Sequence, residues 1–275
     1  MTISDKSIIL VLTVTSALAV ILAPAAVAEE GPSEEKAIER DLIWSLLRAE
    51  DAVSEILAEM DRSLLEASLA LSLVGIEGPE AREVLEELGR LGPFVVDCIT
   101  IDLNGTILEV APEEYSFVLG ERIDQQEHIK RLLSTRRPVG LAYIESVEGF
   151  YAMDFASPIF DEEGRLVGAV TVLVSPTVLF GDALAPHQPE GGAKIWAMTP
   201  SGTIVYDPDA DQIGRNTFSD PLFREFPELL AVAERVKMER SGKGVYRIFE
   251  TARGVYWTTV YHQGSEMRLL LSVDL

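Results

Sequence analysis

The side chains best suited to bind a charged small molecule lie near the middle of the sequence. Tyr151 and Asp154 share one expected strand, Tyr143 lies on the strand before it, and Arg122 precedes the expected helix ahead of both. An arginine and an aspartate can pair with a ligand's carboxylate and ammonium, while tyrosine rings close the sides. We therefore expect ligand-binding residues at Arg122, Tyr143, Tyr151 and Asp154. In the alternative interpretation the tyrosines pack at a sheet edge and Arg122 is a surface charge.

Residues for catalysis or metal binding are not apparent in the sequence. His128, His187 and His262 are scattered, and none has a second His or a Cys at ligand spacing. Residues 207–211 read DPDAD, but the glycine and the final carboxylate of a calcium loop do not follow. No nucleophile elbow, P-loop or dinucleotide-binding pattern occurs. The sequence thus predicts no catalytic residue, no metal site, no cofactor and no enzymatic activity.

The charge balance excludes some partners. Asp and Glu number 45 against 23 Lys and Arg, which gives a net charge of −22 at pH 7. Such an acidic protein is a poor partner for nucleic acid and for anionic membrane surfaces. The hydrophobic fraction of 47% is enough to build globular cores. The single cysteine, Cys98, is expected to be a buried thiol.

Residues 1–28 resemble a secretory signal peptide. Lys6 lies in a short polar region, residues 8–23 are apolar, and Ala26-Val27-Ala28 fits a cleavage site. We expect a secreted or extracytoplasmic protein that begins at Glu29. The alternative is an uncleaved N-terminal segment that anchors the chain in the membrane.

Residues 29–92 are expected to be helical. Apolar side chains recur at steps of four and three over residues 34–74, which predicts one long amphipathic helix; they are Leu42, Leu46, Ala49, Val53, Ile56 and Met60. A short helix over residues 79–91 follows. We expect the long helix to pack on its own domain, and the alternative is a homodimer formed through it.

The rest of the chain contains one structural unit twice. Residues 99–123 and 195–218 each predict a strand, a turn with glycine, a second strand and an acidic loop, with Gly105 and Gly202 in the turns. A helix and three strands follow each hairpin, which favours antiparallel sheets. Asp124 is the expected N-cap of the first helix. Residues 175–192 are expected to be a linker, and the second helix is expected near residues 221–240.

Several stretches together resemble the double Cache family of extracytoplasmic sensor domains, which contain two PAS-like units. They are IDLNGTI, PIFDEEGRLVGAVTVLV, SGTIVYDPD, QIGRN, SGKGVY and VYWTTV, and the resemblance covers residues 34–275. It implies an α+β fold in which a long N-terminal helix precedes two antiparallel β-sheet units. Residues 93–180 would be the membrane-distal Cache unit and residues 181–275 the membrane-proximal type. The arginine followed by Trp-Tyr that some amino-acid-binding relatives have is absent.

The resemblance implies a non-catalytic sensor that binds a small organic ligand, a carboxylate, an amino acid or an amine, in the first unit. Many relatives carry an intracellular output module, whereas this sequence ends with the second unit, so we expect a separate membrane-bound signalling partner. The second unit's matching strand, Val255–Tyr261, has no carboxylate, and we therefore expect the site in the first unit and not the second. The alternatives are an interaction and dimerisation module with unoccupied pockets, or a secreted hydrolase.

Overall fold

The computed structural model describes residues 34–275. The expected signal peptide at residues 1–28, and the alternative of an anchor there, lie outside the described residues. Within residues 34–275, no helix is both long and apolar enough to cross a membrane.

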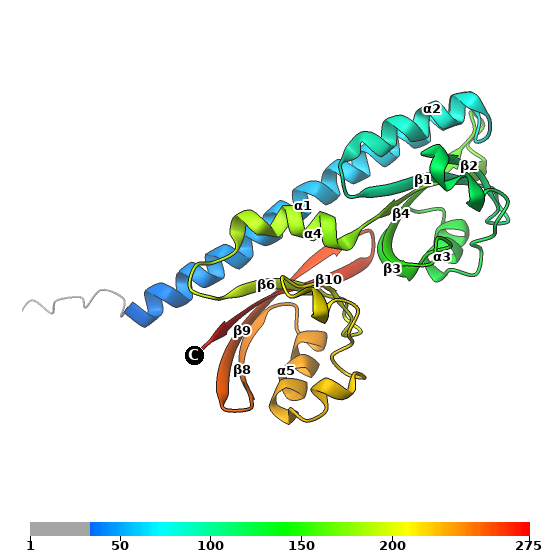
Figure 1. Ribbon diagram of the computed structural model, residues 1–275. Coiled ribbons are helices and arrows are strands. Elements are labelled where there is room, and N and C mark those ends of the chain that lie inside the picture. Colours follow the sequence, from blue (N-terminus) through cyan, green and yellow to red (C-terminus); the bar gives the residue numbers. More distant parts are fainter. Residues whose placement is uncertain (1–33) are drawn as a thin grey trace, which may run out of the picture.

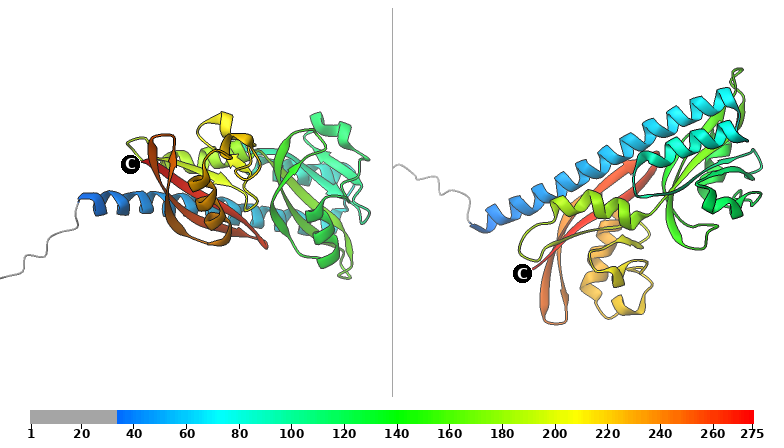
Figure 2. Two further views of the ribbon diagram at one scale, coloured as in Figure 1. Left: turned by 90° about the horizontal axis from the view of Figure 1, so that it is seen from below. Right: turned by 45° about the horizontal axis from the view of Figure 1, so that its top comes forward.

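A single long helix, α1 (Glu34–Val74), runs along the whole molecule, as the apolar spacing predicts (Figure 1). Its inward stripe is buried, including Leu46, Val53, Met60 and Leu71. The helix contacts β4 and β5 of the first sheet and β9 and β10 of the second, whose bounds are given below. Helix α2 (Pro79–Leu88) turns back beside α1, and a short 3-10 helix follows at Gly89–Leu91 (Figure 2).

The first sheet has five antiparallel strands in the order β2-β1-β5-β4-β3. They are β1 (Val95–Ile101), β2 (Ile107–Ala111), β3 (Val139–Glu145), β4 (Tyr151–Phe160) and β5 (Leu166–Val174). The 3-10 helix Glu113–Val118 and helix α3 (Glu127–Thr135) lie over the face that points away from α1.

The second sheet repeats this order as β7-β6-β10-β9-β8, again fully antiparallel. The strands are β6 (Lys194–Met198), β7 (Ile204–Tyr206), β8 (Gly242–Ile248), β9 (Thr251–His262) and β10 (Ser265–Asp274). Helix α5 (Pro227–Met238) covers its outer face. The α+β fold of a long helix and two matching antiparallel sheets is therefore confirmed.

The stretch expected to be a linker, residues 175–192, is largely helical, so that expectation was wrong. It forms α4 (Pro176–Leu184) and a 3-10 turn at Ala185–His187. The Ser175 hydroxyl caps the helix by accepting the Val178 N–H at 3.4 Å, and Pro176 fits the first turn. Leu179 and Phe180 are fully buried, and α4 packs against α1. The expected domain boundary between residues 180 and 181 falls inside this helix, and the domain limits remain a prediction.

Two helix starts also differ from expectation. Helix α3 begins at Glu127 and not beside Asp124, because the Asp124 carboxylate is 2.9 Å from the Arg122 guanidinium and caps no helix. The helix expected near residues 221–240 is split into a 3-10 turn, Pro221–Phe223, and α5. Pro227 lacks the N–H needed to continue a helix from before it, and it opens a new one instead.

The packing divides each sheet into two different faces. The faces toward α1 share one continuous apolar core that includes Cys98, Phe155 and Leu271. The faces away from α1 have separate cores, one beneath α3 and one beneath α5. We call the sheet and helices up to α3 and β5 the first unit, and residues from β6 onward the second unit. The outer face of each unit is where a ligand site can form.

Candidate functional site

The expected site residues of the first unit do not converge on one point. Side chains alternate between faces along a strand, and Tyr143 lies opposite Met153, whose side chain belongs to the α1-side core. Asp154 therefore points to the other face. Tyr143 and Tyr151 do meet, because their rings stack with centroids 5.5 Å apart. The side chain of Tyr151 is largely exposed.

Arg122 lies apart from the other three residues. Its guanidinium donates to Asp124 at 2.9 Å and to the Asn104 carbonyl at 3.2 Å, and its side chain is 58% exposed. It belongs to the loop that forms a β-bridge with Thr106 beside the first hairpin. The structure thus uses this arginine to join the loop and the turn.

Asp154 belongs to a row of three residues across the first sheet. Asp97 on β1 is paired with Leu173 on β5, which is paired with Asp154 on β4. We call Asp97, Leu173 and Asp154 the first-sheet row. Both aspartates are only 2% exposed, and a hydrogen bond of 2.6 Å joins Asp154 Oδ2 to Nε2 of His128 on α3. Two carboxylates are therefore buried on the outer face of the sheet, close to α3.

Several acceptor atoms around this row have no partner. Within the described residues, Asp97 Oδ2, Asp154 Oδ1 and Glu148 Oε2 are buried and make no hydrogen bond. Gln126 Oε1 and Ser146 Oγ are in the same situation. Burial, together with the neighbouring Glu148 and Asp154 carboxylates, raises the pKa of Asp97 to about 8. Buried polar atoms are normally satisfied, so this group has spare capacity to accept hydrogen bonds.

An open groove of about 700 Å3 lies beside this row. Its walls come from α3, from β3 and from the turn between β9 and β10, and they include His128, Tyr143, Glu145 and Ser265. The Arg131 guanidinium donates to the Ser265 hydroxyl at 3.1 Å, so the two units meet at this groove. A ligand could reach His128 and Tyr143 from solvent through it.

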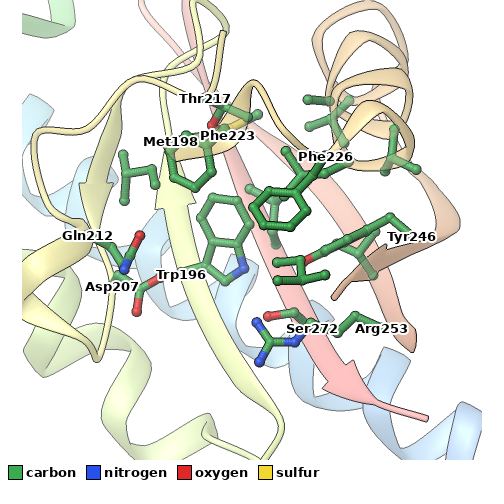
Figure 3. Close-up of a pocket in the computed structure, with 18 of the residues that line it drawn as sticks. Trp196, Met198, Asp207, Gln212, Thr217, Phe223, Phe226, Tyr246, Arg253 and Ser272 are labelled. Atoms are coloured by element: carbon green, nitrogen blue, oxygen red, sulfur yellow. The ribbon is translucent and has the colours of Figure 1, made fainter. Parts of the chain in front are cut away.

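The second unit has a better enclosed cavity on its equivalent face, beneath α5 (Figure 3). We call it the second-unit cavity, and its volume is about 340 Å3. Most of the wall is apolar; it includes Trp196, Met198, Phe223, Phe226, Leu229, Val255 and Leu270. Figure 3 shows the Trp196 and Phe226 rings side by side in the middle of the cavity, with the polar residues at one end.

The polar end of this cavity contains Lys194, Asp207, Gln212, Arg253 and Ser272. Arg253 Nε donates to Asp274 at 2.7 Å, and Asp207 accepts the Asp209 N–H at 2.8 Å. Burial raises the pKa of Asp207, against the lowering effects of that N–H and of Lys194. The end of the cavity therefore carries both signs of charge.

The sequence-based prediction did not include Asp97, Glu148, Lys194 and Arg253. A signal for two of them was present: Asp97 and Lys194 lie at the same distance before the turn glycines Gly105 and Gly202. Alignment of the two hairpins would have revealed an acid and a base at equivalent positions. Glu148 had no such marker, because it lies in a turn, where charged residues are common. Arg253, near the start of β9, had none either.

Among residues 34–275, no group of three or more His, Cys, Asp or Glu side chains is arranged to hold a metal ion. In the first unit, the unpaired carboxylate oxygens can accept hydrogen bonds from a cationic ligand. The second unit offers an apolar cavity with both cationic and anionic side chains at one end.

Comparison with known proteins found one matching family model and several similar structures. The model of the family "HK/GC/Chemotaxis protein-like, sensor domain" matches residues 55–176. Among curated proteins, none matches the chain. An extracellular ligand-binding receptor from Desulfohalobium retbaense DSM5692 has a similar structure, with 34% identity and a TM-score of 0.73. The similarity covers 83% of this chain and 39% of that receptor chain, so this chain spans well under half of it.

Two chemoreceptor domains are more distant in sequence. The ligand-binding domain of Pseudomonas fluorescens CtaA with L-serine has 15% identity and a TM-score of 0.63, over 87% of this chain and 97% of that one. The domain of Pseudomonas aeruginosa PAO1 PctB with L-Arg has 16% identity and a TM-score of 0.61, over 87% and 96%. At these identities the likeness establishes the fold. Residues 55–176 of this chain therefore resemble the sensor domains of the HK/GC/chemotaxis protein-like family, and residues 34–275 have the double Cache fold.

Proposed function

We propose that this protein is an extracytoplasmic, non-catalytic sensor whose first unit binds a small molecule with an ammonium group, an amino acid or an amine. The observation that supports it most is the set of buried, unpaired oxygens on Asp97, Glu148 and Asp154. The site keeps Asp154 from the sequence prediction and adds the other two carboxylates. Ligand contacts by Arg122, Tyr143 and Tyr151 remain predictions, and Arg122 would have to leave Asp124 to make one.

The energetic argument concerns like charges out of water. Burying a carboxylate without a partner costs several kcal/mol, and a second carboxylate nearby adds to that cost. A proton on Asp97 relieves part of it, which is why its pKa is raised. An ammonium ligand reduces this burial cost more than a proton does. It brings a positive charge and up to three N–H donors for the three unpaired carboxylate oxygens.

This arrangement couples binding to pH. Because the pKa of Asp97 is about 8 without ligand, an arriving ammonium group would displace the Asp97 proton near neutral pH. The apparent affinity should therefore increase as the pH rises from 6 towards 8. A ligand bound through its carboxylate alone would show no such increase.

The structural neighbours are consistent with this ligand class. CtaA was solved with L-serine and PctB with L-Arg, two ligands that share an α-ammonium and differ in side chain. The present chain carries two buried aspartates, Asp97 and Asp154, on the outer face of its first unit, and these select for positive charge by Coulomb attraction.

Calorimetry with three matched compounds tests the proposal. L-serine and ethanolamine carry an ammonium group, whereas glycerate replaces the ammonium of serine by a hydroxyl. We expect serine or ethanolamine to bind, glycerate to fail, and Asp154→Asn to abolish binding. Glu121→Gln is the matched control, since Glu121 is an exposed carboxylate of the same unit. Binding of glycerate alone, or full binding by Asp154→Asn, would contradict the proposal.

The proposal includes location and signalling. We infer an extracytoplasmic protein, secreted or held by its N-terminal segment, that passes ligand binding to a membrane-bound signalling partner. N-terminal sequencing of the native protein distinguishes the two forms: Glu29 at the N-terminus indicates cleavage, and Met1 indicates an anchor.

A second candidate is an interaction module that dimerises through α1. Leu65, Leu69 and Leu73 are 56%, 60% and 75% exposed and recur every four residues on one side of this helix. Light scattering on the wild type and Leu69→Glu tests it. A dimer that the glutamate converts to a monomer supports this candidate, and a wild-type monomer excludes it.

A further inference from the structure

We propose that the second-unit cavity is a separate binding site for a small monocarboxylate with an aromatic or branched aliphatic body. It uses no residue of the first unit and stands independently of the ammonium site. The double Cache fold would then hold two ligands of opposite charge in one chain.

The size and walls of the cavity determine the body of the ligand. A volume of about 340 Å3 accommodates a single ring with a short chain, at the lower end of the range for ligand sites. The walls come from β6, β8, β9, β10, α5 and the 3-10 turn Pro221–Phe223, and they include Trp196, Met198, Phe223 and Leu270. Met198 and Leu270 are almost fully buried below the cavity. An apolar ligand would gain contacts there that water cannot make.

The sheet register determines which end is polar. Lys194 on β6 is paired with Ser272 on β10, which is paired with Val255 on β9. We call these three residues the second-sheet row. It occupies the position of the first-sheet row, with Lys194 in place of Asp97 and Val255 in place of Asp154. The outer face has therefore exchanged two carboxylates for one ammonium group, while the strands remain the same.

Lys194 and Arg253 are the cationic side chains at the polar end of the cavity, and both have N–H donors that can bind a ligand's carboxylate. Within residues 34–275 the Lys194 ammonium group makes no side-chain hydrogen bond or salt bridge, and its charge lowers the pKa of the nearby Asp207. Arg253 is bound to Asp274 through Nε, and its guanidinium has further N–H donors. The two aspartates are engaged by backbone N–H groups: Asp207 accepts from Asp209 at 2.8 Å, and Asp209 accepts from Asp211 at 3.2 Å.

These positions give a carboxylate a defined orientation. Its apolar body would lie against the Trp196 and Phe226 rings, which Figure 3 shows facing the cavity. Its oxygens would lie at the end where Arg253 and Ser272 are drawn, within reach of Lys194. Bonds between a carboxylate and charged N–H donors are stronger than neutral ones, so the charge contributes specificity as well as affinity.

Calorimetry with three compounds of one shape tests this site. They are 3-phenylpropionate, 3-phenylpropan-1-ol and 3-phenylpropylamine, which end in an anion, a neutral hydroxyl and a cation. We expect 3-phenylpropionate to bind about tenfold more tightly than the alcohol through the charged hydrogen bonds. Lys194→Gln combined with Arg253→Gln should remove that advantage and leave alcohol binding unchanged. Arg247→Gln, at an exposed position on β8, is the control and should change nothing.

Two further variants localise the binding. Ala233→Leu places a larger side chain in the cavity from α5 and should abolish binding of both the acid and the alcohol. Asp154→Asn should leave 3-phenylpropionate binding intact. Circular dichroism checks folding, and if Ala233→Leu is unfolded the Lys194/Arg253 comparison decides alone. The inference is overturned if 3-phenylpropionate shows no saturable binding at millimolar concentration. It is also overturned if the double variant binds it unchanged, or if Asp154→Asn loses it.

Discussion

The two units of this chain differ most on the sheet face that points away from α1. Both sheets have the same strand order and nearly the same register. The first-sheet row places Asp97 and Asp154 on that face, and each has one buried carboxylate oxygen that accepts no hydrogen bond. The second-sheet row places Lys194 and Val255 there, beside an apolar cavity.

The sheet faces that point toward α1 are similar in the two units, because both are apolar. Cys98, Phe155 and Val172 of the first sheet and Ile195, Val260 and Leu271 of the second are all apolar, buried and part of one core. The comparison shows how a duplicated unit can diverge. The face that packs on α1 must stay apolar to keep both sheets in place, so ligand chemistry can change only on the outer face.

The largest expected effect is on the shared core. Phe155 is fully buried. Its ring packs edge-on against the His262 ring of the second unit, with the two ring centroids 5.4 Å apart. Phe155→Ala should lower the free energy of unfolding by about 3–5 kcal/mol, because it leaves a cavity. Chemical denaturation followed by circular dichroism measures this. If α1 joins both units, the variant should still unfold in one transition; loss of the first unit alone, with the second intact, would show that the units are independent.

The next effect is on ligand binding in the first unit only. Asp154→Asn should weaken ammonium binding by about 2–4 kcal/mol, because the ligand's charge would lose a buried carboxylate. Binding of 3-phenylpropionate should stay the same. Parallel titrations of the two ligands measure both values on one sample. Equal losses for both ligands would mean that one site serves both, and the comparison between units would fail.

A smaller effect concerns pH and stability. The pKa of Asp97 is about 8 in the folded protein, far above its value of 3.8 when exposed. The folded state therefore holds this proton where the unfolded state releases it, so stability decreases as the pH rises from about 4 to 8. We expect a loss of about 1–3 kcal/mol between pH 5 and 8, seen as a lower unfolding temperature.

Asp97→Asn removes the titrating group and should flatten this pH dependence. It should also stabilise the ligand-free protein at pH 8 while weakening ammonium binding, a trade between stability and function. Glu121→Gln should leave the wild-type profile unchanged. A steep profile that persists in Asp97→Asn would assign the dependence to other groups.

The smallest effect concerns His262, which joins the second unit to α1. Burial lowers its pKa, while the Asp61 carboxylate at 2.9 Å raises it. The neutral ring is favoured in the folded state, so its contribution is present above about pH 6.5 and is lost as the pH falls below that value. Asp61→Asn should lower the pKa of His262 further, because it removes the carboxylate that favours the charged ring. An NMR titration of the ring protons measures it, and a higher pKa in the variant would contradict this assignment.

The repeat and the fold could be predicted from the sequence, because Gly105 and Gly202 mark matching turns and α1 has a clear apolar stripe. The start of α3 could not, because the bond from Arg122 to Asp124 removes a plausible cap. The role of residues 175–192 was hidden, since proline and glycine there suggested a linker while Ser175 and Pro176 begin a helix.

The candidate site could be predicted only in part. Asp154 was expected as a ligand-binding residue and stays a prediction; the structure shows that its carboxylate is buried with one oxygen unpartnered. The sequence could not show that Tyr143 and Asp154 lie on opposite faces of the sheet. Their relative position depends on the register between β3 and β4. The second-unit cavity could not be predicted, because its walls come from β6, α5, β8, β9 and β10 and form only when these elements pack together.

The most direct measurement is a crystal structure of the protein grown with both ligands, the strongest binder of the serine and ethanolamine pair together with 3-phenylpropionate. The account predicts the ammonium nitrogen within hydrogen-bond distance of Asp97 or Asp154. It predicts the carboxylate within the same distance of Lys194 or Arg253, with the phenyl ring on Trp196. Both ligands in one unit, or the ammonium on Asp207 and the carboxylate beside His128, would contradict the claim that the two units bind opposite charges.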